Sequence, residues 1–186
     1  MRSNTNNFIQ IFTIEDYNQL LVLKQKSSLV NLPLSPYSKN AINNMLEVLK
    51  SKNKGVGLAA SQIGINERII ICSFTGKIED FEIMINPSCV KDGNTIEEGW
   101  EGCFSIPLTF AKVSRWKDIS VSYYTEEGSI INKSLNGFAA RVYQHELDHL
   151  EGILMTEKSS EIKKFNSQEE FNLFLQMVRK ERGNKV

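Results

Sequence analysis

The spacing of apolar residues along the chain predicts three amphipathic helices. Between Ser38 and Lys52, apolar residues recur at spacings of one, three and four, the pattern of a helix that buries one face. A second helix is predicted from Phe138 to about Leu150, where Gly152 ends it. A third is predicted over about 168–182, with its apolar residues on one face. The chain therefore has helices in its first third and towards its C-terminus.

Runs of β-branched and aromatic residues between these helices predict strands. Arg68–Cys72 is a β-branched run typical of a buried strand, and Phe81–Asn86 resembles a second strand that we expect Pro87 to end. Ile119–Tyr124 and Ser129–Leu135 flank an acidic turn that contains a glycine, which is the pattern of an antiparallel hairpin. Strands that are joined by short turns favour antiparallel pairing.

Two segments near the N-terminus carry weaker signals. Phe8–Ile14 has a mixed apolar pattern that fits either a short strand or a turn. Asn31–Tyr37 contains two prolines and is predicted to be a loop. The order of helix, strands, helix and helix favours an α+β fold, and we expect one domain over residues 1–186, with helices towards both ends.

Composition and charge exclude several classes of protein. The chain has 186 residues, of which 41% are hydrophobic and 24% are charged, as in a soluble globular domain. Twenty-two basic residues balance 22 acidic ones, so no net charge favours nucleic acid or an anionic membrane. No apolar run approaches the ~20 residues of a membrane span, and three cysteines make a disulfide framework unfavourable. We therefore expect a cytoplasmic protein without a membrane or nucleic-acid partner.

The sharpest chemical signal is the segment His145-Glu146-Leu147-Asp148-His149, which contains the two histidines of the chain. On a helix, residues four apart lie about 40° apart around the axis, so both imidazoles could reach one metal ion. Glu146 lies on the flank of that face, where a carboxylate could accept a proton from water. The alternative is that these are ordinary polar residues of an amphipathic helix.

A catalytic metal site usually has three protein ligands, so a third ligand must come from another segment. Cys103 is the best candidate, because it follows a glycine in the turn-like segment Glu101–Ser105. Taken alone, a cysteine is more often a small buried apolar residue. We assign that structural role to Cys72 and Cys89.

Three motifs together resemble those of the peptide deformylase family. The family patterns GxGLAAxQ, EGCLS and QHExDH correspond here to the segments 55–62, 101–105 and 144–149. They occur in the same order, with 41 residues from Gln62 to Cys103 and 42 from Cys103 to His145. The resemblance extends from about Gly55 to Leu154. It implies a domain of antiparallel strands around a central metal-binding helix.

The resemblance also implies an activity, which is removal of the N-formyl group from the initiator methionine of new polypeptides, with release of formate. By similarity, Cys103, His145 and His149 bind one divalent ion, with Fe²⁺ expected in the cell and Zn²⁺, Ni²⁺ or Co²⁺ also accommodated. Glu146 would be the proton carrier, and nascent peptides at the ribosome would be the substrates. The side-chain amide of Gln62 and the backbone N–H of Phe104 would stabilise the oxyanion.

The substrate would bind as an added strand beside the first motif. By similarity, the backbone of Gly57 would hold the peptide, and Val56 would lie alongside it. Val56, Phe138 and Val142 are candidates for the apolar pocket of the methionine side chain, with Arg141 as a neighbour.

The chain departs from the family patterns at three places. Phe104 replaces the usual leucine, and its larger ring could reshape the pocket. Leu108-Thr109-Phe110 stands where many members carry an arginine that contacts the downstream peptide. Asp16–Val30 lacks the usual N-terminal proline.

Two other functions fit parts of the sequence. A metallopeptidase with an H-E-x-x-H helix would cut internal bonds, but it normally takes its third ligand from a later histidine or glutamate, and no third histidine follows. A catalytically silent relative would bind N-terminal peptides without hydrolysis, although Glu146, Gln62 and Cys103 are all retained.

A further interaction is predicted between Asp148 and Arg115. Asp148 lies on the flank of the helix, and Arg115 follows Cys103 by twelve residues, where deformylases also tend to carry arginine. We expect a bidentate ion pair that fixes the helix to the strand region after Cys103. The alternative is that Asp148 is a solvated carboxylate.

Overall fold

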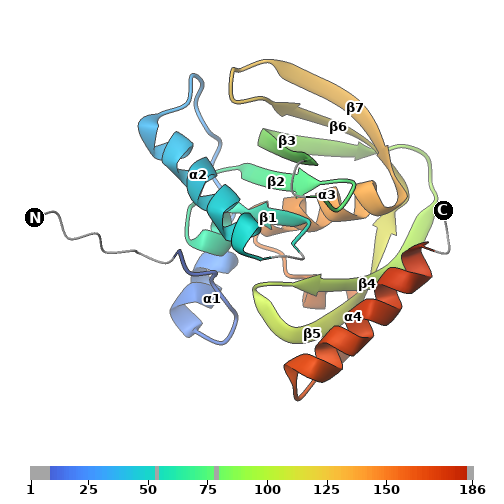
Figure 1. Ribbon diagram of the computed structural model, residues 1–186. Helices are drawn as coiled ribbons and strands as arrows, with labels where there is room; N and C mark the ends of the chain where they lie inside the picture. Colours follow the sequence, from blue (N-terminus) through green and yellow to red (C-terminus); the bar gives the residue numbers. More distant parts are fainter. Residues whose placement is uncertain (1–8, 53–54, 78–79, 184–186) are drawn as a thin grey trace, which may run out of the picture.

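The computed structural model describes residues 9–52, 55–77 and 80–183. Four α-helices and eight β-strands follow one another along this part of the chain, together with short 3₁₀ helices (Figure 1). The α-helices are α1 Tyr17–Leu23, α2 Pro36–Ser51, α3 Gly137–Leu150 and α4 Gln168–Gly183. The strands are β1 Gly57–Ala59, β2 Ile69–Ser73, β3 Phe81–Lys91, β4 Ile96–Cys103, β5 Ile106–Trp116, β6 Asp118–Tyr124, β7 Ile130–Asn136 and β8 Ser159–Lys164.

The strands form two antiparallel sheets that lie on either side of α3. The five-stranded sheet has the order β1-β2-β3-β6-β7, and the three-stranded sheet has the order β4-β5-β8. Helix α3 contacts β1, β2 and β7 of the first sheet and β5 of the second (Figure 1). The predicted α+β domain, with antiparallel strands around a central helix, is therefore confirmed.

Helix α3 is central because it buries both an apolar face and polar side chains. Ala140, Tyr143 and Leu150 are fully buried in one core cluster with residues of β2, β3 and β6. Helix α4 instead packs on the outer side of the three-stranded sheet (Figure 1), where its Phe171 and Phe174 contact Phe110 of β5. One helix thus supports both sheets from between them, while the last helix covers one sheet from outside.

The prediction that Pro87 ends the second strand is wrong, because the strand continues beyond it. Strand β3 runs through Pro87 to Lys91, with a register shift between Ile85 and Ser88 against β6. Asn86 adopts φ 50° at this irregularity, and its side-chain amide exchanges two hydrogen bonds of 2.9 Å with the backbone of Val30. A bulge needs no ladder N–H at the proline, so the strand can continue past it.

The other local predictions are confirmed to within a few residues. The helices expected at 38–52, 138–150 and 168–182 correspond to α2, α3 and α4, and the hairpin corresponds to β6 and β7. Helix α2 begins earlier than expected, at Pro36, with Ser35 as its N-cap, so the proline-containing loop is shorter. The segment Ile9–Ile14 has no regular structure, and Phe8 lies outside the described residues. Among the described helices, none combines the length and apolar character that crossing a membrane requires.

Candidate metal centre and active site

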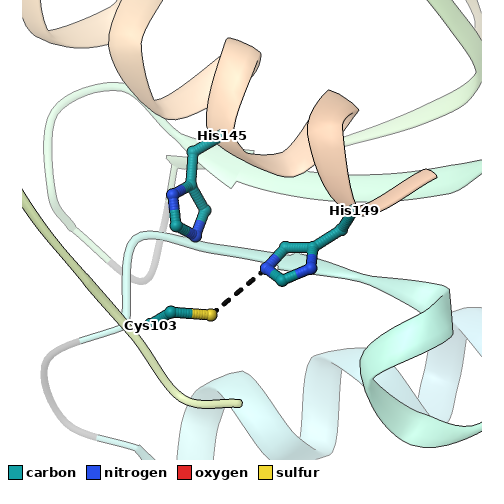
Figure 2. Close-up of side chains that lie close together, drawn as sticks. All are labelled: Cys103, His145 and His149. Carbon is teal, nitrogen blue, oxygen red and sulfur yellow. Dashed lines mark hydrogen bonds between the residues drawn. The ribbon is translucent and has the colours of Figure 1, made fainter. Parts of the chain in front are cut away.

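Cys103, His145 and His149 lie together between the two sheets. Cys103 ends β4, and the histidines lie one turn apart on α3 (Figure 2). Their ligand atoms all lie within 4.8 Å of one another, and Cys103 Sγ is 3.2 Å from His149 Nε2. The two imidazole rings are inclined by 78°, with centroids 5.1 Å apart. One ion could therefore contact all three side chains.

The electrostatics of this group fit a divalent ion. Burial raises the pKa of the Cys103 thiol, but His149 and His145 lower it more strongly, and the pKa lies well below its ordinary value. A thiolate with two imidazoles is a donor set that suits a borderline ion with an open fourth position. His145 Nδ1 is 2.9 Å from Glu101 Oε2, which leaves His145 Nε2 as the nitrogen available to the group.

Glu101 links His145 to two buried arginines, a role that was not predicted from the sequence. Its carboxylate is 5% exposed and accepts hydrogen bonds from Arg115 Nε and Nη2, both at 2.9 Å. Arg141 Nη1 donates to the same carboxylate at 2.8 Å. Burial raises the pKa of Glu101, but Arg115 and His145 outweigh it, so the pKa lies far below its ordinary value. Its only sequence signal was its place in the motif around Cys103.

The predicted contact between Arg115 and Asp148 is confirmed. Arg115 Nη1 contacts Asp148 Oδ2, and Lys158 Nζ donates to the other Asp148 oxygen at 3.0 Å. The geometry differs from the prediction, however, because the bidentate partner of Arg115 is Glu101 and not Asp148. Arg115 therefore joins the helix of the histidines to the strand of Cys103 through two carboxylates.

The Glu146 side chain lies directly against Gly57 of the first motif. Its side chain is buried, with 5% exposure, and a Cβ built on Gly57 would lie 2.4 Å from Glu146 Oε1. Burial raises the pKa of Glu146 to about 7, although His145 and His149 oppose this shift. A carboxyl group in this range can both take up and release a proton near neutral pH.

Gln62 is buried beside Cys103 and is not a solvated loop residue. Its Oε1 accepts the Ala59 N–H at 2.9 Å, so the orientation of the amide is fixed. Its Nε2 donates to Ser105 Oγ at 3.1 Å and contacts Cys103 Sγ at 3.4 Å. The side-chain N–H₂ of Gln62 therefore points towards the ligand group. Ser105, which is fully buried, was not predicted to take part.

The backbone of Gly57 lies at a free sheet edge. Strand β1 is the last strand of the five-stranded sheet, and Ser73 N–H donates to Val56 O at 2.7 Å. Since alternate residues of a strand direct their backbone groups to opposite edges, those of Gly57 face away from β2. The sheet thus offers one N–H and one C=O beside Glu146.

The three candidates for the apolar pocket meet at one core cluster, and their expected neighbour Arg141 does not join them. Val142 is buried in the core cluster around Ala59 and Cys72, and Val56 and Phe138 pack against the same cluster. Arg141 instead turns its guanidinium towards Glu101 and the backbone of β4 and β5. The expectation that Arg141 borders the apolar pocket is therefore not supported.

Phe104 and the two other cysteines lie outside the ligand group. The Phe104 ring is partly buried and lies against Gly55, where a Cβ would be 2.8 Å from Phe104 Cζ. Cys72 is fully buried in β2, as its structural assignment predicts, whereas Cys89 in β3 is half-buried. Cys89 lines a surface hollow over β3, β6 and β7, and a second hollow lies beside Phe81. Neither hollow is lined by Cys103, His145 or His149.

Comparison with known proteins identifies the family of this chain. The family model described as polypeptide deformylase matches residues 10–165. Peptide deformylase 1 of Prochlorococcus marinus is 37% identical over 125 residues, which cover 63% of this chain and 65% of that relative, just under two thirds of its length. Peptide deformylase of Fusobacterium nucleatum is 36% identical over 155 residues, which cover 83% of this chain and 87% of the relative.

Solved structures agree with this result. The crystal structure of peptide deformylase from Thermotoga maritima superposes with a TM-score of 0.73 and 32% identity, covering 83% of this chain and 99% of that one. The chain therefore belongs to the peptide deformylase family and is a metal-dependent hydrolase of that type.

Proposed function

We propose that this chain removes the N-formyl group from the initiator methionine of nascent polypeptides and releases formate. The observation that carries the proposal is a convergence of four groups. The ligand group, the Glu146 carboxylate, the Gln62 amide and the free edge at Gly57 all border one place between the sheets. Amide hydrolysis needs a Lewis acid, which the ligand group would hold, and a proton carrier, which Glu146 would be. It also needs a hydrogen-bond donor to the oxyanion and a means of holding the peptide.

Cys103, His145 and His149 would hold the ion. We propose Fe²⁺ as the ion in the cell, with Zn²⁺, Ni²⁺ or Co²⁺ able to replace it, because one thiolate and two imidazoles suit all four. When bound, the ion supplies Lewis acidity that makes water a better nucleophile and polarises the formyl carbonyl.

Glu146 would carry the proton of the reaction. It takes a proton from the attacking water, whose oxygen bonds to the formyl carbon, and delivers it to the amine as the C–N bond breaks. Two features of Glu146 support this role: its burial, and an Oε2 without a hydrogen-bond partner among the described residues. A buried carboxylate oxygen with no protein partner is suited to meet water or substrate.

Gln62 and Phe104 would stabilise the tetrahedral intermediate. Hydrogen bonds to Ala59 and Ser105 hold the Gln62 amide. Its remaining N–H therefore points towards the ligand group before substrate arrives. The backbone N–H of Phe104, next to Cys103, is the second proposed donor. Donors that are oriented in advance need no reorganisation when charge develops on the oxygen.

The peptide would bind along the free edge of β1. Gly57 would exchange backbone hydrogen bonds with it, as in strand addition. The methionine side chain would then contact the apolar surface to which Val56, Phe138 and Val142 belong. We propose that these substrates are met at the ribosome in the cytoplasm, where new formylated chains emerge.

One assay separates this proposal from its two alternatives. Formate release is measured from formyl-Met-Ala-Ser, with an unformylated internal peptide in parallel, using protein loaded with Fe²⁺, Ni²⁺ or Zn²⁺. Release of formate without cleavage of the internal peptide supports deformylation. Cleavage of the internal peptide would identify a metallopeptidase, and peptide binding without either product would identify a silent relative.

A further inference from the structure

We infer that Arg141 is a positioning residue for His145, acting through the Glu101 carboxylate. This inference rests on the ligand set proposed above. Arg141 lies one turn before His145 on α3, so both side chains leave the same face of the helix. Its guanidinium donates to Glu101 and to backbone carbonyls of β4 and β5.

The Arg141 guanidinium fastens α3 to the sheet that carries Cys103. Its Nη1 donates to Val113 O at 2.8 Å and to Gly99 O at 3.3 Å, and its Nη2 donates to Glu97 O at 2.6 Å. These carbonyls belong to β4 and β5, and the side chain is 11% exposed. One side chain therefore fixes the distance between the histidine helix and the end of β4.

The Glu101 carboxylate transmits this restraint to His145. Its Oε1 accepts hydrogen bonds from Arg141 Nη1 and from Arg115 Nε. Its Oε2 accepts from Arg115 Nη2 and faces His145 Nδ1. An ionised carboxylate only accepts hydrogen bonds, so His145 carries its proton on Nδ1 and presents Nε2 to the ion. Arg141 prevents the carboxylate from turning away from this contact.

The surroundings of Arg141 provide room for its guanidinium and carboxylates to pair with the buried charges. A Cβ built on Gly99 would lie 3.1 Å from the guanidinium, so the strand carries a glycine where the arginine passes. Glu101 pairs with Arg115 and Arg141, and Asp148 pairs with Arg115 and Lys158. Removing Arg141 would leave the buried Glu101 carboxylate with one arginine in place of two, and three backbone carbonyls without this donor.

The test uses zinc-loaded full-length protein with Arg141→Met. We expect zinc affinity, measured by competition with a chelator, to fall about 10–100-fold. Imidazole ¹⁵N NMR gives a direct second measurement, because the chain has two histidines. The His145 Nδ1–H signal should be lost or shifted, while the signals of His149 keep their positions.

Arg68→Met is the matched control. The Arg68 side chain is as buried as that of Arg141, also at 11% exposure, and it likewise binds a carboxylate and a backbone carbonyl, those of Glu151 and Pro87. It should lower stability and leave zinc affinity and both imidazole spectra unchanged. Arg141→Lys should recover part of the affinity, since an ammonium can still donate to Glu101, and it serves as the test if the Met variant does not fold.

The outcomes are distinguishable. If wild-type protein fails to bind zinc, the proposed ligand set is wrong, whatever Arg141 does. If wild type binds zinc, and Arg141→Met keeps its affinity within twofold and its His145 signal in place, Arg141 is structural and the inference is overturned.

Discussion

The Glu146 carboxylate occupies the volume that a side chain on Gly57 would need. A Cβ at Gly57 would lie 2.4 Å from Glu146 Oε1 and 2.9 Å from its Cδ. Gly57→Ala should therefore displace the carboxylate and lower kcat/KM about 100-fold, the effect expected of a misplacement near 1 Å. Zinc content and circular dichroism, measured on the same preparation, should stay near wild type. Activity within threefold of wild type would contradict the proposed position of Glu146.

Replacing Glu146 separates proton transfer from ion binding. Glu146→Gln should keep full metal content, because the side chain is outside the ligand group. Its kcat for formate release should fall about 10²–10⁴-fold, which is the contribution of general acid–base catalysis. Metal analysis and initial rates on one sample give both values. A variant that keeps near-normal turnover would show that another group carries the proton.

Cys103 and Cys72 should respond differently to substitution. Cys103→Ala should lose metal and activity together, because the substitution removes a ligand. Treating the wild-type protein with a chelator should have the same effect. Cys72→Ala, in the core of β2, should cost roughly 0.5–3 kcal/mol of unfolding free energy and leave metal content intact. Full metal occupancy in Cys103→Ala would remove Cys103 from the ligand set.

Arg115→Lys tests the bidentate contact with Glu101. A lysine cannot reproduce the two parallel hydrogen bonds from Nε and Nη2. We expect a lower melting temperature and a roughly 10–100-fold loss of metal affinity. Asp148→Asn should have a smaller effect, because Asp148 contacts Arg115 through one nitrogen. Equal effects of the two substitutions would show that Glu101 is not the principal partner.

Gly55 and Phe104 should behave as a coupled pair. A Cβ at Gly55 would approach Phe104 Cζ to 2.8 Å, so Gly55→Ala should destabilise the protein by about 1–3 kcal/mol. The smaller side chain in Phe104→Leu should restore much of this loss in the double variant. Urea unfolding of the four proteins in this cycle measures the coupling. Simple additivity of the two changes would show that the contact carries no energy.

Helices and turns could be predicted from the sequence because their signals are local. The apolar face of α2 and the turn between β6 and β7 are each encoded within a few neighbouring residues. Strand β4 carries no such signal, since Ile96–Cys103 contains two glycines and three glutamates, residues that are depleted in strands. It forms by pairing with β5 and by the hydrogen bonds that Arg141 gives to its carbonyls.

The same distinction applies to the site. His145, Glu146 and His149 could be identified from helical spacing, and the contact of Arg115 with Asp148 from their positions relative to the motifs. Glu101 could not, because its partners Arg115 and Arg141 come from β5 and α3, and nothing in a single segment records their meeting. The direction of Arg141 was likewise set by Gly99, 42 residues earlier in the chain.

The length of β1 has a consequence for solubility. An unpaired sheet edge can recruit strands from other molecules, and long flat edges promote aggregation. Here the edge comprises Gly57–Ala59, and the 3₁₀ helix Ala60–Ile63 ends it at once. A second copy of the chain could form few ladder hydrogen bonds along such an edge, whereas a short extended peptide needs no more. The short edge of β1 thus suits the strand addition proposed for the substrate and disfavours sheet extension between copies of this chain.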